Sequence, residues 1–207
     1  MALKTINKYV GRQFSNPVGI GGTIAAKTMN IINKEHYRAV KKYVCKNNGA
    51  RVLDIGFGNG HMIKLLSGYA GVKLYGIDIS PDMLEKAQAL NADGVSLNRI
   101  MLSQASVTDL PYNDGWFDTV YTINTVYFWG EYEKAFAEIL RVLKSGGNFI
   151  CTFYSDEFLD KLPPAKDGFV KFTPQKLRAM ARENGFVNVK VKILKEDKAF
   201  CLIGEKP

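Results

Sequence analysis

The chain has 207 residues, of which 46% are apolar and 23% are charged, and its formal net charge is +8. At about 150 residues per domain, this length predicts a single globular domain that needs no metal or disulfide to fold. No apolar run approaches the roughly 18 residues of a membrane span, residues 1–10 lack the apolar core of a signal peptide, and the three cysteines form no CxxC pair. We therefore expect a cytoplasmic protein without a metal site, rather than a membrane, secreted or zinc protein.

Basic residues gather at the two ends of the chain, in residues 1–50 and 161–207, whereas residues 51–160 carry a net negative charge. Basic ends of this kind attract anionic substrates, nucleic acid or a membrane surface. Alternatively, the spread-out lysines of residues 1–50 keep a helical surface solvated. The sequence alone leaves both interpretations open.

From Arg51 onward, short apolar runs alternate with helical patterns, which predicts βαβ units and a parallel sheet. We expect strands at residues 51–55, 73–79, 99–105, 117–122, 148–154, 187–194 and 199–204. Helices are predicted at 62–69, 81–90, 132–143 and 174–183, where apolar residues recur at helical spacing. Ser80-Pro81 and Thr173-Pro174 are typical helix starts, and Ser145-Gly146-Gly147 is expected to end the third of these helices.

The last two predicted strands lie so close together that they should pair as a hairpin around Glu196-Asp197. This predicts a mostly parallel sheet with one antiparallel strand at its edge. A further helix is predicted before the first strand and is expected to cover the carboxyl edge of the sheet. The residues at helical spacing in it are Met29, Ile32, His36, Val40 and Val44.

A glycine-rich loop, Gly56-Phe57-Gly58-Asn59-Gly60, follows the first predicted strand and opens a helix. A ligand approaches the backbone closely only where no Cβ intervenes, and a tight strand-to-helix turn often needs a positive φ. A purely structural turn would also use glycines. The dinucleotide fingerprint G-x-G-x-x-G is not matched, because His61 stands at its third glycine, and this disfavours a nicotinamide-dependent enzyme.

Asp78 ends the second predicted strand, about 20 residues beyond the glycine loop. A carboxylate at this place accepts hydrogen bonds from both hydroxyls of a ribose. The alternative role is an N-terminal cap for the next helix. Because the glycine loop lies upstream, we favour ribose binding.

Four motifs carry a more specific resemblance. Val52–Gly60 and Gly76–Leu84 are followed by Leu110-Pro111-Tyr112 with Phe117-Asp118, and then by Arg141–Gly147. In this order they resemble the class I S-adenosylmethionine-dependent methyltransferases, in particular the branch near the ubiquinone-biosynthesis methyltransferases (methyltransferase type 11). The resemblance extends from about residue 50 to the C-terminal strands.

This resemblance implies an α/β fold of the Rossmann-like, doubly wound type, with a seven-stranded, mostly parallel sheet. The implied strand order is 3-2-1-4-5-7-6, with the last-inserted strand antiparallel and an N-terminal helical lid. We accordingly expect a single methyltransferase domain over residues 1–207. Within it, residues 1–48 would be a basic helical or lid segment and residues 49–207 the catalytic core.

The resemblance also implies which residues contact S-adenosyl-L-methionine, or its product S-adenosylhomocysteine. By the family pattern, Asp78 would hold the ribose hydroxyls and Ile79 would pack on the adenine. Ser106 departs from the pattern, because many relatives have an aspartate there; its hydroxyl still accepts a hydrogen bond, but without charge assistance. Asn124 either contacts the methionine part or forms an Asx turn. The full set is Asp54, Gly56, Phe57, Gly58, Gly60, Asp78, Ile79, Ser106, Val107 and Asn124.

Tyr127-Phe128-Trp129 is an aromatic triplet just beyond the fourth predicted strand. Parallel sheets bind ligands beyond the carboxyl ends of their strands, so these rings are expected near the transferred methyl group. The alternative is hydrophobic packing. We expect at least one ring to face the cavity and at least one to lie in the core.

The segment around Tyr9-Val10-Gly11-Arg12-Gln13-Phe14 resembles N-terminal stretches of small bacterial methyltransferases. By this resemblance Tyr9, Arg12 and Phe14 would form a lid, and a basic tail is the alternative. The catalytic residue is not identified. Tyr9, Tyr127 and His61 are weak candidates for a general base.

Family membership implies methyl transfer to a small-molecule acceptor by in-line displacement, in which the protein aligns the reactants and excludes water. One alternative is an RNA or other nucleic-acid methyltransferase that uses the basic ends. A nicotinamide-dependent oxidoreductase and a cofactor-binding regulatory domain are others. Because Asn124-Thr125-Val126-Tyr127 does not match the N/D-P-P-Y/F signature, an adenine-N6 methyltransferase is disfavoured, although other nucleic-acid targets are not excluded by this. No RNA-binding module is recognised in the sequence, and we therefore do not expect nucleic acid as a partner. The sequence determines neither the acceptor nor the oligomeric state.

Overall fold

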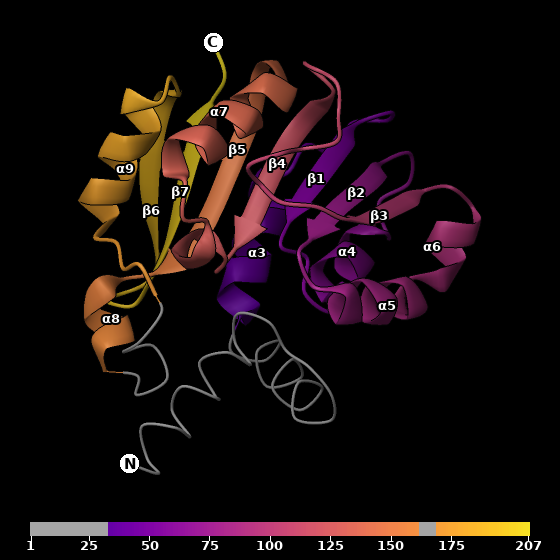
Figure 1. Cartoon of the computed structure of the whole chain (residues 1–207), viewed down its shortest axis with the longest axis horizontal. Coiled ribbons are helices and arrows are strands. Elements are labelled where there is room, and N and C mark those ends of the chain that lie inside the picture. Colours follow the sequence, from indigo (N-terminus) through magenta and orange to yellow (C-terminus); the bar gives the residue numbers. More distant parts are fainter. Residues whose placement is uncertain (1–32, 162–168) are drawn as a thin grey trace.

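The computed structural model describes residues 33–161 and 169–207, and its centre is a seven-stranded sheet with the order β3-β2-β1-β4-β5-β7-β6 (Figure 1). This order confirms the one implied by the resemblance. The strands are β1 (Arg51–Ile55), β2 (Lys73–Asp78), β3 (Ile100–Gln104), β4 (Phe117–Ile123), β5 (Leu143–Tyr154), β6 (Val187–Lys195) and β7 (Ala199–Glu205).

The C-terminal hairpin forms as predicted, but its antiparallel strand is not at the edge. β7 pairs antiparallel with both β5 and β6, whereas β1 to β5 pair in parallel. The reason is composition. The apolar β7 is largely buried, while β6 carries exposed lysines at alternate positions and therefore takes the edge.

Eight helical segments of the described chain connect or flank the strands. They are α3 (Lys34–Tyr43), α4 (His61–Leu66), α5 (Pro81–Leu90), α6 (Ala92–Ser96), η1 (Val126–Phe128), α7 (Tyr132–Val142), α8 (Asp156–Asp160) and α9 (Pro174–Glu183). The predicted starts of α5 and α9 are confirmed, because the Ser80 and Thr173 hydroxyls accept hydrogen bonds from Met83 N and Lys176 N. α6, η1 and α8 were not predicted, because segments this short complete no apolar repeat.

One boundary differs from the prediction. α7 ends at Val142, before the serine and two glycines expected to stop it, and β5 begins at once with Leu143. Leu143 is paired with Phe117 of β4, and Gly146 has a φ of +73°, which lets the strand bend before it continues. A register shift between Phe117 and Thr119 accommodates the bend.

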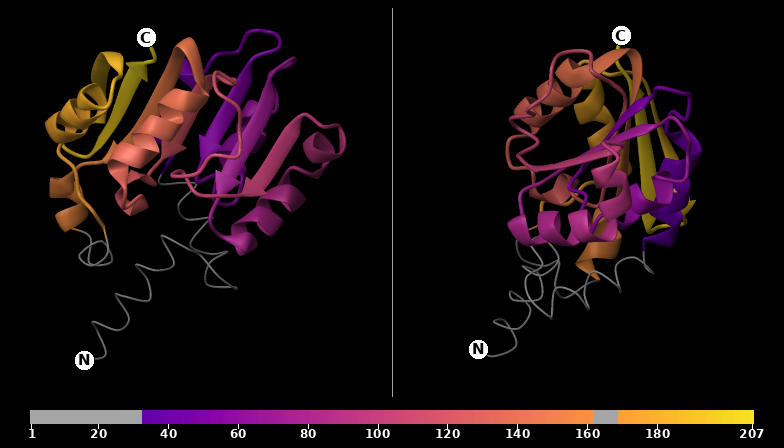
Figure 2. Two further views of the ribbon diagram at one scale, coloured as in Figure 1. Left: turned by 45° about the horizontal axis from the view of Figure 1, so that its top comes forward. Right: turned by 90° about the vertical axis from the view of Figure 1, so that its right-hand side faces the viewer.

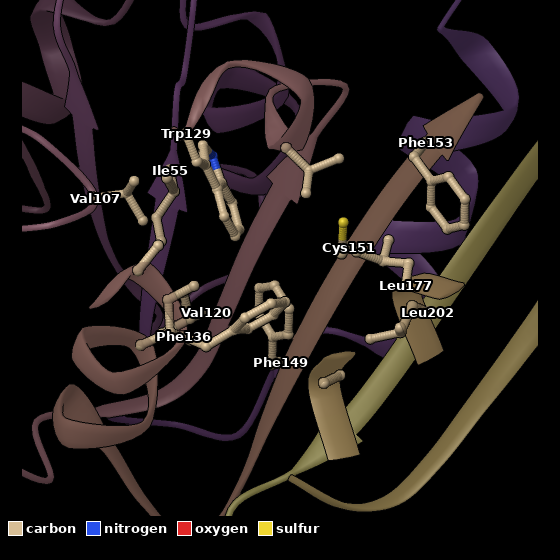
Figure 3. Close-up of a cluster of buried hydrophobic side chains, with 14 of the residues drawn as sticks. Ile55, Val107, Val120, Trp129, Phe136, Phe149, Cys151, Phe153, Leu177 and Leu202 are labelled. Carbon is tan, nitrogen blue, oxygen red and sulfur yellow. The ribbon is translucent and has the colours of Figure 1, made fainter. Parts of the chain in front are cut away.

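Two apolar layers cover the two faces of the sheet. α7 and α9 bury Phe136, Ile139 and Leu177 on one face, and Figure 3 shows Phe136 beside Phe149 of β5. On the other face α3, α4 and α5 contribute Val40, Ile63, Met83 and neighbouring residues to a second cluster. In the right-hand view of Figure 2, α7 and α3 accordingly lie on opposite sides of the strands.

The prediction that the leading helix covers the carboxyl edge of the sheet is wrong. α3 lies on the sheet face and contacts β4, β5, β6 and β7. His36, Ala39 and Val40 form its buried stripe, and burying that stripe requires the broad face rather than the edge. Met29 and Ile32 lie outside the described residues. Across the described residues, no helix has both the length and the apolarity needed to cross a membrane.

Candidate functional site

A cavity of about 220 Å³ lies at the carboxyl ends of β1, β2 and β4. Its floor is the glycine loop, and loops after β2, β3 and β4 form its walls. The lining residues are Asn33, Tyr37, Asp54, Ile55, Gly56, Phe57, Gly58, Asn59, Met62, Ile77, Asp78, Ile79, Met83, Ala105, Ser106, Val107, Ile123, Asn124, Thr125, Phe128 and Trp129. None of these residues is basic, and the two that carry an acid are Asp54 and Asp78.

Gly56 and Gly58 line the cavity, and each has a positive φ, +75° and +55°. A Cβ on Gly56 would lie 2.5 Å from Cγ2 of Thr125, so this glycine is required by close packing against the loop after β4. At Gly58 no atom of the protein lies within 4 Å of a Cβ position. Gly58 therefore presents bare main chain to open space, as a ligand cradle requires.

Gly60 and Phe57 have different surroundings from those predicted. Gly60 does not line the cavity, and a Cβ there would lie 2.8 Å from Cβ of Ala87. The third glycine of the loop is thus explained by the contact between the start of α4 and helix α5. Phe57 borders the cavity, but its ring is buried against Gly76 of β2.

Asp78 lies at the end of β2, facing the loop. Its Oδ2 accepts a hydrogen bond from Gly58 N at 2.9 Å, and its Oδ1 accepts one from Ser80 N at 2.9 Å. Burial raises the pKa of Asp78, and the main-chain donors of Ser80, Gly58 and Ile79 oppose that rise. Each carboxylate oxygen accepts more than one hydrogen bond, so acceptor capacity is left for a ligand diol. The capping alternative is not the role of this residue, because the cap of α5 is Ser80.

The wall beyond Asp78 is apolar. The side chain of Ile79 borders the cavity and is 59% exposed, which is unusual for isoleucine and leaves an apolar surface for a flat ring. Val107 also lines the cavity and is buried. Ser106 also lines the cavity, but its hydroxyl is engaged within its own loop. It accepts from Thr108 N at 3.2 Å and lies 2.8 Å from Oγ1 of Thr108.

Asp54 is a buried acid at the end of β1. The Tyr121 hydroxyl donates to its Oδ2 at 2.7 Å. Burial raises the pKa of Asp54 to about 8; the hydrogen bond from Tyr121 opposes this rise, and the charge of Asp78 adds to it. The cavity therefore contains a carboxyl group that holds its proton near neutral pH and releases it most readily when a cation is close.

Asn124 follows β4 in a left-handed conformation, with a φ of +58°. Its Nδ2 donates to Oδ1 of Asn33 at 2.9 Å, and its Oδ1 accepts from the Tyr127 hydroxyl at 3.2 Å. Asn33 and Tyr37 line the cavity from the start of α3 and were missed in the sequence. Four residues apart, they share one helix face, but no motif marks them and only the packing of α3 brings them to the site.

The aromatic triplet divides between the cavity and the core, as expected. Phe128 and Trp129 line the cavity. Trp129 is packed against Phe136, with 5.9 Å between the ring centroids (Figure 3). The indole N–H of Trp129 donates to Thr125 Oγ1 at 3.3 Å. Tyr127 does not line the cavity. Its hydroxyl accepts from Tyr154 N at 2.5 Å, so Tyr127 ties η1 to β5 and is not placed to act on a ligand.

The remaining predicted residues lie elsewhere. His61 is not among the lining residues; its ring lies 5.4 Å from that of Tyr37, and burial lowers its pKa. Because His61 does not line the cavity, its candidacy as a base is weakened. Tyr9, Arg12 and Phe14 are outside the described residues.

Comparison with known sequences finds that this chain is similar to methyltransferases. A family model described as a methyltransferase domain matches residues 53–151. An O-methyltransferase, resE, from Aspergillus sclerotiorum is 27% identical over 77% of this chain and 63% of its own length, so this chain spans less than two thirds of that relative. A ubiquinone/menaquinone biosynthesis C-methyltransferase, UbiE, from Geobacter sp. (strain M21) is 29% identical over 75% of this chain and 67% of its own length.

Solved structures show the same fold. One is a putative methyltransferase in complex with the Haloferax volcanii Trm112 activator. It is 20% identical and superposes with a TM-score of 0.76 over 87% of this chain and 93% of that chain. Another is a Haemonchus contortus phosphoethanolamine N-methyltransferase with phosphomonomethylethanolamine and S-adenosylhomocysteine. It is 16% identical, with a TM-score of 0.71 over 84% of this chain and 53% of that chain.

Proposed function

The chain belongs to the class I S-adenosylmethionine-dependent methyltransferases, and we propose that it methylates a small organic acceptor at the carboxyl ends of β1, β2 and β4. The supporting observation is the cavity itself, which is lined both by the bare main chain at Gly58 with Asp78 and by the aromatic residues Phe128 and Trp129. The names of UbiE and of the phosphoethanolamine N-methyltransferase also refer to small-molecule acceptors.

We propose the following placement of S-adenosylmethionine. Asp78 accepts hydrogen bonds from the ribose hydroxyls, and the exposed side chain of Ile79 covers one adenine face. Val107 contributes its main-chain N–H to the adenine edge. The Ser106 hydroxyl, already bonded to Thr108, makes at most a secondary contact. The two cavity glycines allow close approach of the methionine part, and Asp54 and Asn124 border its far end.

When bound, this cofactor supplies a methyl group on a positively charged sulfur. Transfer of that group to the acceptor would leave S-adenosylhomocysteine, with the electron pair of the broken carbon–sulfur bond on sulfur, and the proton of the acceptor would pass to water. The chain contributes alignment and exclusion of water. Phe128 and Trp129 provide an apolar wall for the acceptor, and ring faces also attract a cationic sulfur.

Calorimetry and turnover test this proposal. S-adenosylhomocysteine titrated into the full chain is expected to bind at one site, whereas NADH is expected not to bind. Incubation with S-adenosylmethionine and a panel of phenols, amines and carboxylic acids should then release S-adenosylhomocysteine with one class. A folded protein that does not bind S-adenosylhomocysteine would contradict the proposal. Binding without turnover on any acceptor, nucleic acid included, would favour a regulatory domain.

Two broader predictions stay proposals. We propose that the chain is one domain with residues 49–207 as the catalytic core. Within residues 1–48, the proposed lid is the part before α3, because α3 itself packs on the sheet face. The proposed location of the chain is the cytoplasm. Proteolysis with and without S-adenosylhomocysteine tests the lid, because cofactor contact should protect cleavage sites near Arg12.

A further inference from the structure

Described parts of the two basic ends, α3 and β6, meet on one face of the fold. On α3, Lys34, Arg38 and Lys42 follow one another at intervals of four residues, so they form a stripe along one side of the helix. All three are exposed, because the opposite side of α3, with Ala39 and Val40, is buried on the sheet.

β6 adds its lysines to the same face. Lys190 is paired with Ile203 and Lys192 with Cys201, and directly paired residues point to the same side of a sheet. Ile203 and Cys201 belong to the apolar cluster beneath α3, and α3 contacts β6. Lys34, Arg38, Lys42, Lys190 and Lys192 therefore form one surface, called here the α3–β6 basic surface.

Acidic residues do little to neutralise this surface. Glu35 forms an ion pair with Arg38, at an N–O distance of 2.5 Å, whereas the four lysines take part in no ion pair of the described chain. The positive charge continues into the turn after β6. There the charge of Lys198 lies close to His36 of α3. Burial lowers the pKa of His36 to about 3, and the charge of Lys198 adds to this lowering.

We propose that the α3–β6 basic surface binds an anionic phospholipid membrane surface. Four of its five cations are lysines, which act as hydrated point charges and suit attraction to a charged plane. Recognition of RNA would favour arginine forks and exposed aromatic rings for stacking bases. The exposed large apolar residues of the described chain include no aromatic ring.

This surface also lies beside the cavity. Asn33 lines the cavity and Lys34 follows it directly, so a membrane contacting α3 lies next to the cavity mouth. The inference does not depend on which acceptor is methylated. A different explanation is that the β6 lysines only prevent association of edge strands. That explanation predicts no vesicle binding.

Co-sedimentation of the full chain with vesicles tests the proposal. Binding to phosphatidylcholine vesicles that contain phosphatidylglycerol is expected at low salt, with little binding to phosphatidylcholine alone. At about 1 M salt the screening length falls to about 3 Å, and binding should be lost. Because each lysine near an anionic surface changes binding about fivefold, Lys190→Gln with Lys192→Gln should weaken it roughly 25-fold.

The matched control is Lys134→Gln with Lys176→Gln, which removes two exposed lysines from α7 and α9 on the opposite layer. This control is expected to sediment as the wild type does. No binding of the wild type to anionic vesicles, or equal losses in the two double variants, would overturn the proposal. If single-stranded RNA bound instead, and only the β6 variant lost that binding, the surface would be assigned to nucleic acid.

Discussion

The loops after β1 and β2 differ in chemistry from the loop after β4, although all three border one cavity. The first two present main chain and a carboxyl group, with Gly58 open to the cavity and Asp78 fixed by two N–H donors. The loop after β4 presents side chains, and these also pack inward, as Trp129 does on Phe136. The polar groups of the first two loops are therefore separate from the hydrophobic core, whereas the aromatic residues of the loop after β4 belong both to the cavity lining and to the core.

The largest expected effect is on the polar side. Asp78→Ala removes the proposed ribose acceptor and leaves Gly58 N–H and Ser80 N–H without their partner. Two hydrogen bonds to a charged group are together worth about 3 kcal/mol, so S-adenosylhomocysteine affinity should fall more than about 100-fold. Calorimetry measures it, with Glu85→Ala, an exposed acid of α5, as the control. Equal affinities of the two folded variants would remove Asp78 from the site.

Two glycines of the same five-residue loop have different roles: Gly58 faces the cavity, whereas Gly60 packs against Ala87. Gly60→Ala should cost about 2–4 kcal/mol of unfolding free energy, because it combines a positive φ with overpacking on Ala87. Gly58→Ala, at a similar φ but in open space, should cost only about 1–2 kcal/mol. Urea unfolding compares them. In calorimetry only Gly58→Ala should weaken cofactor binding beyond its effect on folding, and the reverse result would exchange the two roles.

Asp54 predicts a dependence of stability on pH. Its folded pKa, about 8, exceeds that of an unfolded aspartate, so the folded state holds a proton that the unfolded state releases. This contribution is fully present below about pH 4 and is lost as the pH rises to 8. Below pH 6.5 it is partly masked, because buried neutral His36 loses stability on acidification.

The measurement therefore belongs between pH 6.5 and pH 8. There the unfolding free energy of the wild type should fall by up to about 1.4 kcal/mol per pH unit, a total of about 2 kcal/mol. Asp54→Asn keeps the shape but does not titrate, so its slope should be flatter. Parallel slopes for the two proteins would show that Asp54 is already ionised at pH 6.5.

The smallest effects concern the aromatic triplet. Tyr127→Phe removes the acceptor of buried Tyr154 N–H and should cost about 1–2 kcal/mol of stability, with no loss of S-adenosylhomocysteine affinity. Phe128→Leu should do the opposite, with little effect on unfolding and a raised KM for the acceptor. Thermal unfolding and steady-state kinetics together check this pair. A Tyr127→Phe variant with normal stability but altered kcat would return Tyr127 to the list of candidate bases.

Local features of the site were predictable from sequence. A strand, a glycine turn and an acid at the end of the next strand are determined by backbone sterics within a few residues, and they formed as predicted around Gly58 and Asp78. The strand order came from resemblance to a family. Sequence reasoning from the hairpin alone put the antiparallel strand at the edge, because it does not compare how deeply β6 and β7 are buried.

Contacts between distant segments were decided only by the tertiary structure. Gly60 faces Ala87, Tyr127 ties η1 to β5, and Asn33 joins Asn124 across 91 positions of sequence. The basic residues of α3 and β6, separate along the chain, share one face because α3 buries its apolar stripe beside β6. Steric contacts between neighbouring residues determine the conformation within a turn. Burial of apolar surface determines which distant segments pack together, and a short stretch of sequence does not specify that packing.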